Sequence, residues 1–136
     1  MKKILILVLC LCFSFGLVGC KTSKVSTPEA CDLATYKKYA LPLMQELSDI
    51  VDKTDMSDAS SRKAAKSSLQ YLLFNINQVK CKNDFPLKHE TLEYSVRHLI
   101  AAIDYADKGD YDEATLSINK ATLNIENFLD WSVDVD

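Results

Sequence analysis

The chain has 136 residues, a net charge of −3 at neutral pH, five cysteines and three glycines. This acidic balance makes nucleic acid an unsuitable partner, and the sequence contains no P-loop, GxSxG or dinucleotide-binding fingerprint. The length that follows a short N-terminal segment suits one domain with a single hydrophobic core. We therefore expect one domain without enzyme activity.

Residues 1–19 have the layout of an export signal. Two lysines precede an apolar stretch of 15 residues that ends at Val18, and this is shorter than the roughly 20 residues of a membrane-spanning helix. Leu17, Val18, Gly19 and Cys20 resemble the lipobox of bacterial lipoproteins. The resemblance implies that residues 1–19 are removed and that Cys20 carries diacylglycerol and a further acyl chain such as palmitate. It also implies that lipid anchors the exported protein to the cell membrane or the outer membrane of a bacterium.

Two alternatives for this segment stay open: an ordinary signal peptide in which Cys20 is incidental, and an uncleaved N-terminal anchor. Residues 20–30 then form a polar stretch that contains Pro28 and is typical of a flexible tether. Ten such residues have an end-to-end distance of roughly 17 Å and an extended length of about 35 Å. We expect the domain of residues 31–136 to lie close to the membrane without lying in it.

The cysteines predict one disulfide. Cys10 and Cys12 lie in the segment that would be removed, and Cys20 would be acylated, which leaves Cys31 and Cys81. An exported protein usually oxidises such a pair. A metal site would need more ligands than two thiols that stand far apart without a CxxC or clustered histidines. We expect no metal and no cofactor there, and a disulfide that stabilises the fold by about 4 kcal/mol.

Four stretches of the domain show apolar residues at alternating steps of three and four, which is the spacing of one helical face. Helices are expected over about 31–53, 58–80, from residue 88, after a turn at 83–87, to 108, and from residue 111 to 131. No stretch predicts a strand. The four apolar faces are Leu33, Tyr36, Ala40, Leu43, Leu47 and Ile50; Ala65, Leu69, Leu72, Ile76 and Val79; Leu92, Val96, Leu99, Ile103 and Ala106; and Ala114, Ile118, Ala121, Ile125 and Phe128.

Four helices joined by short loops predict an all-α fold, an antiparallel up-down four-helix bundle with one disulfide. A hairpin of the first two helices brings Cys31 and Cys81 to the same end. Pro42 predicts either a kink or a break with a second helix start, and the unbroken spacing favours the kink. Gly109 suits the left-handed residue that closes the third helix, and Asp110 suits the cap of the fourth.

The sequence from Tyr105 to Ala121 resembles the hairpin of a tetratricopeptide repeat. The resemblance covers some 25 residues once, and Glu126 stands where the repeat has its closing proline. Since such repeats bury their faces by stacking about three copies, a true array is not expected. If the resemblance is more than convergent, it implies peptide binding. The matching positions are Ala102, Tyr105, Gly109, Tyr111, Ala114, Ile118 and Ala121.

Metal and haem patterns are incomplete. The acids around Gly109 fail as an EF-hand, because three key ligand positions hold Ala106, Lys108 and Thr115. His89-Glu90 lacks the second histidine of HExxH, and no Glu-x-x-His pair occurs for a di-iron site. Met44 and His98 would lie at similar heights if the first and third helices run parallel, so a haem carrier is kept as an alternative.

Four exposed apolar positions suggest a partner groove. Tyr39 and Leu41 flank the proline of the first helix, and Tyr71 and Phe74 lie off the apolar face of the second. Such side chains could accept an amphipathic helix. The resulting hypothesis is a lipid-anchored protein-binding or scaffolding domain that resembles, in outline only, the pilotin lipoproteins that escort secretins. A small-molecule or haem carrier and a structural or immunity-type surface lipoprotein are the alternatives.

Charge is distributed unevenly along the domain. The net charge is +2 over Cys31 to Lys82 and −8 over Asn83 to Asp136. Without residues 1–19, which carry two lysines and no acid, the chain has a charge near −5. We expect solubility and a mild attraction of the lysines to anionic lipid.

Overall fold

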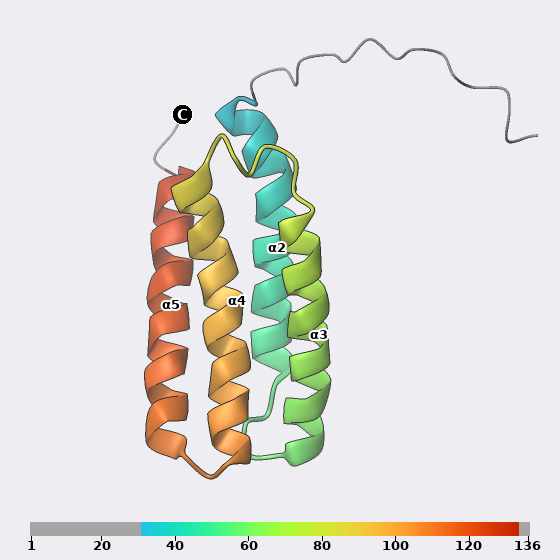
Figure 1. Cartoon of the computed structure of the whole chain (residues 1–136), viewed down its shortest axis with the longest axis vertical. Helices are drawn as coiled ribbons and strands as arrows, with labels where there is room; N and C mark the ends of the chain where they lie inside the picture. The colour runs from blue at the N-terminus through green and yellow to red at the C-terminus, as the bar shows by residue number, and fades with distance from the viewer. Residues whose placement is uncertain (1–30, 134–136) are drawn as a thin grey trace, which may run out of the picture.

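The computed structural model describes residues 31–133, and within this range the fold is an antiparallel four-helix bundle (Figure 1). The predicted fold class is therefore confirmed. The signal segment, Cys20 and the tether lie outside the described residues. No helix among those described is long and apolar enough to cross a membrane. The helices are α2 (Leu33–Lys53), α3 (Ala59–Asn77), α4 (Pro86–Asp107) and α5 (Tyr111–Val133).

Short polar side chains decide where three of the helices begin. The Asp32 carboxylate accepts a hydrogen bond from the Thr35 backbone N–H at 2.7 Å before α2, and Asp58 accepts one from the Ser61 N–H at 2.7 Å before α3. Asp110 caps α5 in the same way. Each carboxylate satisfies a backbone donor that the first helical turn leaves unpaired. Helix α4 begins with Pro86 instead, where the missing N–H costs nothing.

Gly109 closes α4 as the sequence predicts. Its φ is +78°, in the left-handed region. The Asp110 N–H donates to the Tyr105 carbonyl at 2.9 Å, and the Gly109 N–H donates to the Ala106 carbonyl at 3.0 Å. These two bonds form a Schellman motif, which turns the chain directly into α5.

Helix α2 continues through Pro42 without a break. The proline ring is exposed, so the backbone hydrogen bond that it removes lies on the solvent side, where water can compensate for the loss. The alternative of a second helix start at Pro42 is wrong.

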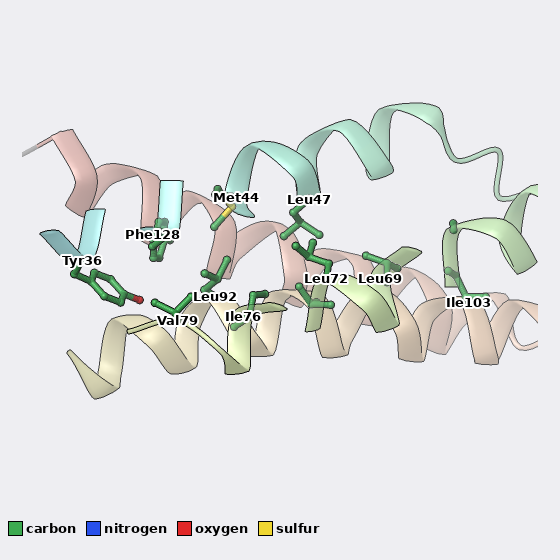
Figure 2. Close-up of a cluster of buried hydrophobic side chains, with 13 residues drawn as sticks. Tyr36, Met44, Leu47, Leu69, Leu72, Ile76, Val79, Leu92, Ile103 and Phe128 are labelled. Carbon is green, nitrogen blue, oxygen red and sulfur yellow. The ribbon is translucent and has the colours of Figure 1, made fainter. Parts of the chain in front are cut away.

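The core consists of the apolar faces that the spacing predicts, and side chains from all four helices point into one interior (Figure 2). Six members of the predicted faces are only partly buried: Leu33, Leu43, Ile50, Leu99, Ile118 and Ile125. Met44 is an addition, because it is 97% buried beside the predicted face of α2. The fully buried members with no exposed surface are Tyr36, Ala40, Leu47, Leu72, Ile76, Leu92, Val96, Ala121 and Phe128.

The four helices do not approach one another equally. Helices α4 and α5 pack most closely, and their buried faces carry small residues, which let two backbones come near each other. Helix α2 packs mainly against α3, and its backbone makes few close approaches to α5. The bundle is therefore tight on one side and open along the seam between α2 and α5. The small residues are Ser95, Ala102, Ala106, Ala114, Ser117 and Ala121.

Candidate functional site

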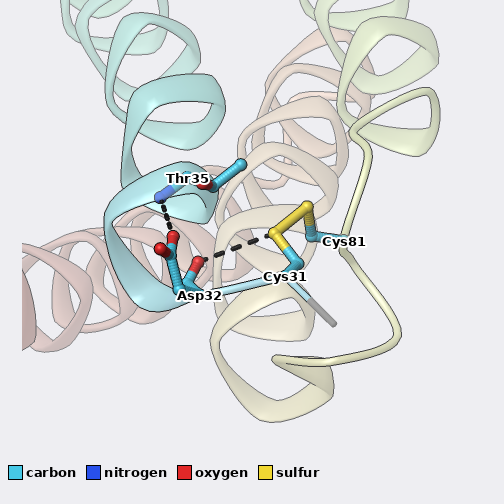
Figure 3. The surroundings of a disulfide bond; sticks show 4 residues. All are labelled: Cys31, Asp32, Thr35 and Cys81. Carbon is cyan, nitrogen blue, oxygen red and sulfur yellow. Dashed lines mark hydrogen bonds between the residues drawn. A yellow bond between two sulfur atoms is a disulfide. The ribbon is translucent and has the colours of Figure 1, made fainter. Parts of the chain in front are cut away.

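Cys31 and Cys81 form the predicted disulfide (Figure 3). Their Cα atoms are 5.4 Å apart, within the range that a disulfide requires. The bond joins the start of α2 to the loop after α3, and we call this end of the bundle, where α4 also begins and α5 ends, the disulfide end. Cys81 has a φ of +73°, which is uncommon for a residue other than glycine.

The two cysteines also lie near a carboxylate. The sulfur atoms of Cys31 and Cys81 and a carboxylate oxygen of Asp84 all lie within 4.8 Å of one another. Because a cysteine binds a metal as a thiolate, the disulfide removes two of these three ligands. In the oxidised chain, Asp84 is therefore the one member of this group that can still bind a metal.

Five rings gather beneath the disulfide. Tyr36 is central, with its ring centroid 5.0 Å from Phe85, 5.9 Å from Trp131 and 6.4 Å from His89. Phe128 continues the cluster at 5.5 Å from Trp131. Most of these pairs are edge-to-face, a geometry that favours aromatic packing beyond the area that it buries. The cluster closes the core at the disulfide end.

Two side chains of this aromatic cluster hold polar atoms without a partner among the described residues. They are the Tyr36 hydroxyl and both ring nitrogens of His89, which is 94% buried. Burial raises the pKa of Tyr36 to about 12. Burial also lowers the pKa of His89, because a buried imidazolium loses its hydration. Glu93 and Glu90 act against this shift, whereas the charge on Lys82 adds to it.

Lysines from two helices meet over Trp131. The Lys37 ammonium of α2 lies 5.9 Å from the ring centroid, and the Lys88 ammonium of α4 lies 5.1 Å from it. Both are cation–π distances. One aromatic ring of α5 therefore holds two positive charges at the disulfide end.

A hollow of about 240 Å³ opens along the seam between α2 and α5. We call it the side hollow. Leu41 and Leu129 stand at its rim with exposed fractions of 39% and 42%. Its walls are mostly apolar, and its polar members are uncharged, so it suits the apolar side chains of a partner. The lining residues are Leu41, Met44, Gln45, Ser48, Ile125 and Leu129.

A second hollow of about 240 Å³ lies at the opposite end of the bundle, which we call the far end. All four helices contribute to this end hollow, and no charged side chain lines it. Thr54 is its one polar member, and the Thr54 hydroxyl donates to the Ile50 carbonyl. The lining residues are Ile50, Val51, Thr54, Met56, Leu69, Leu99, Ala102, Ile103 and Ile118.

The four residues of the predicted groove lie on different sides of the bundle. Leu41 belongs to the side hollow, and Tyr39, two positions earlier, points about 200° away around the helix axis. Tyr39 is two turns from Glu46, which lines a hollow between α2 and α3. Tyr71 and Phe74 lie on α3 with exposed fractions of 64% and 60%. The groove stays a prediction, and the structure gives Leu41 the neighbours Ile125 and Leu129 instead.

The acids near Gly109 are partly engaged by cations of α3. Arg62 donates to Asp107 at 2.6 Å, and Lys66 pairs with Asp104. These two ion pairs link α3 to α4. They also engage carboxylates that a bound metal ion would need.

The residues considered for haem differ in burial. Met44 belongs to the buried core cluster, whereas His98 is partly exposed and is not a member of that cluster. The two side chains are therefore not both core ligands.

Sequence reasoning missed two features of the disulfide end. His89 continues the apolar face of α4 at the step of three before Leu92, so the spacing alone could have indicated its burial. The meeting of Lys37 and Lys88 on Trp131 had no local signal, because the three residues come from three helices that are distant in sequence.

No family model, curated protein or solved structure matches this chain. The physical features that bear on function are the side hollow, the end hollow and the group of Cys31, Cys81 and Asp84.

Proposed function

We propose that this chain is a lipid-anchored envelope protein whose helical domain binds another protein and catalyses no reaction. The surface that we assign to this binding is the side hollow. The observation that carries the proposal is the pair of exposed leucines, Leu41 and Leu129, at the rim of a hollow whose walls include Met44 and Ile125. Apolar surface of this kind is typical of a protein-binding groove.

The side hollow follows from how the helices pack. Helices α4 and α5 pack closely through small residues, and α2 packs mainly against α3, so the seam between α2 and α5 lacks apolar side chains to fill it. An amphipathic helix of a partner could supply them at positions three and four apart. Leu41 and Leu129 would then lose their exposure to water, which favours association.

The cysteine pairing supports the anchor. The disulfide uses Cys31 and Cys81, so Cys20 is the remaining cysteine once residues 1–19 are removed. A thiol without a partner is what lipidation of the lipobox cysteine requires. Two or three acyl chains on Cys20 would anchor the domain stably, since one chain binds a membrane only marginally.

Site-specific photocrosslinking in living cells tests the binding surface. A photoreactive residue at Leu41, or separately at Leu129, should capture one and the same protein. Leu123 is the matched control, because it is an exposed leucine of α5 outside the residues that line the side hollow. Equal capture from Leu123 and Leu41, or no specific capture from either rim position, would contradict the proposal.

The anchor has a separate test. Intact mass measurement of the mature protein should show diacylglycerol and acyl chains on a polypeptide that begins at Cys20. Cys20→Ser should remove this mass and release the protein from the membrane fraction. A mature chain without lipid would refute the anchor. The crosslinking test would still decide whether the side hollow binds a partner.

A second candidate function has one observation in its favour. The end hollow is apolar, reaches the core and measures about 240 Å³, which is larger than an engineered cavity of about 150 Å³ that binds benzene. A carrier of a small apolar molecule would therefore use the end hollow. Addition of benzene or xenon should raise the melting temperature of the wild-type protein. Leu99→Phe, which enlarges a side chain that lines the end hollow, should abolish that increase.

A further inference from the structure

We propose that Cys31, Cys81 and Asp84 form a zinc site when the disulfide is reduced. The two sulfur atoms and a carboxylate oxygen of Asp84 lie within 4.8 Å of one another. Thiolates and carboxylates both bind Zn²⁺, and three protein ligands with one water molecule complete its tetrahedral geometry. The sequence shows only two thiols separated by 50 residues, and the fold supplies the third ligand.

A tight turn brings the carboxylate to the cysteines. The Asp84 N–H donates to the Cys81 carbonyl at 3.0 Å, so residues 81–84 form one β-turn. Cys81 enters this turn with a φ of +73°, a conformation that a side chain disfavours and that clusters at functional sites. Cys31 lies opposite the turn, just before α2 (Figure 3). Two segments that are far apart in sequence therefore place their ligands together.

The spacing allows one ion to contact all three ligands. Two Zn–S bonds of about 2.3 Å in a tetrahedron place the sulfur atoms roughly 3.8 Å apart. The Cα atoms of Cys31 and Cys81 are 5.4 Å apart, so small rotations of the two side chains give this separation once the S–S bond is broken. Asp84 is exposed and both cysteines are only partly buried. An ion can therefore enter from solvent.

The neighbouring charges favour the thiolates that a metal requires. Lys80 and Lys82 flank Cys81 in the sequence, and a nearby cation stabilises a thiolate over a thiol. Asp32, which follows Cys31, opposes this effect. Its carboxylate accepts the Thr35 N–H at 2.7 Å, so part of its charge is compensated by the start of α2.

An external dithiol opens the site. It supplies two electrons and two protons, which break the S–S bond and leave two thiols on the chain, and it is itself oxidised to a disulfide. Zn²⁺ then displaces the two thiol protons as it binds both sulfur atoms. Reoxidation by the disulfide of another molecule reverses both steps and releases the ion. The disulfide and the zinc ion are thus alternative links between the start of α2 and the loop after α3.

Metal titration of the reduced protein tests the site. A chain of residues 21–136 contains all four helices, and Cys31 and Cys81 are its only cysteines. Reduced with a phosphine under argon, it should bind one Co²⁺ per chain with a sulfur-to-cobalt charge-transfer band. One equivalent of Zn²⁺ should displace the Co²⁺, and the oxidised protein should show no band. A reduced protein without the band, or one ion shared by two chains, would refute the proposal.

The decisive comparison is between two variants that each remove one carboxylate charge. Asp84→Asn leaves both cysteines in place and should weaken Zn²⁺ binding by the reduced chain at least about tenfold. Asp52→Asn removes an exposed acid near the end of α2 that is distant from Cys31, and it should change binding less than about twofold because salt screens such distances. Equal affinities of Asp84→Asn and the wild-type protein would overturn the assignment of Asp84.

Thermal unfolding shows whether the ion binds the folded site. Zn²⁺ should raise the melting temperature of the reduced wild-type protein, because an ion that binds only the folded chain stabilises it. The increase should be smaller for reduced Asp84→Asn and absent for the oxidised protein. If reduction alone melts the helices, Zn²⁺ should restore them. No effect on the reduced protein, or an equal effect on the oxidised protein, would refute the site.

Discussion

His89 lies on the buried face of α4, where most of the other residues are apolar. It is 94% buried, it contacts the Tyr36 ring, and neither of its nitrogens has a hydrogen-bond partner among the described residues. The neutral imidazole can be buried at moderate cost, but the imidazolium cannot. The lowered pKa of His89 expresses this difference.

The resulting pH dependence has a definite sign. The ordinary pKa of histidine is 6.5, and that of His89 in the folded chain is lower. Between these two values the unfolded chain binds a proton that the folded chain does not. Stability is therefore fully present above pH 6.5 and is lost as the pH falls through this window, by at most about 1.4 kcal/mol per pH unit.

Urea unfolding from about pH 8 to about pH 5 measures this effect. His89→Phe, which keeps an aromatic ring at the position, should flatten the pH dependence relative to the wild-type protein. His98→Gln is the matched control, because His98 is the other histidine of the chain, and it should leave the slope in place. An unchanged slope in His89→Phe would show that another group titrates.

At the scale of elements, the hairpin of α4 and α5 is the most closely packed part of the bundle. Its two faces meet through alanine and serine, and its turn is set by the Schellman motif at Gly109. The small side chains allow the close approach, and the left-handed glycine allows the short turn that places the two faces opposite each other.

Substitution of Gly109 separates backbone strain from packing. A Cβ atom added there would meet nothing within 4 Å, whereas the φ of +78° disfavours a side chain. Gly109→Ala should therefore lower the free energy of unfolding by about 1 kcal/mol. Gly109→Asn should cost less, because asparagine tolerates the left-handed region. Urea denaturation measures both, and an equal or larger loss for asparagine would contradict the conformational explanation.

At the scale of the whole molecule, the disulfide joins the start of α2 to the loop between α3 and α4 across 50 residues of sequence. It encloses the first hairpin, whose helix α2 forms one wall of the side hollow and whose helices α2 and α3 both line the end hollow. The bond therefore constrains the position of α2, the helix that has few close approaches to α5.

Removal of the disulfide should lower the free energy of unfolding by about 4 kcal/mol, through the conformational entropy that the unfolded chain regains. The double variant Cys31→Ser with Cys81→Ser tests this by urea denaturation. A reducing agent should bring the wild-type protein to the level of the variant and should leave the variant unchanged. Reduced wild-type protein that retains its full stability would contradict the expectation.

The sequence by itself determined the helices, the fold class and the cysteine pair. Apolar residues at steps of three and four specify which face of each helix is buried, and short loops leave neighbouring helices antiparallel. The tertiary structure alone decided that Leu41 stands beside Leu129, and that Lys37 and Lys88 meet on Trp131. The physical reason is that periodicity describes each helix separately. The distance and rotation between helices depend on how side chains from all four of them fill the common core.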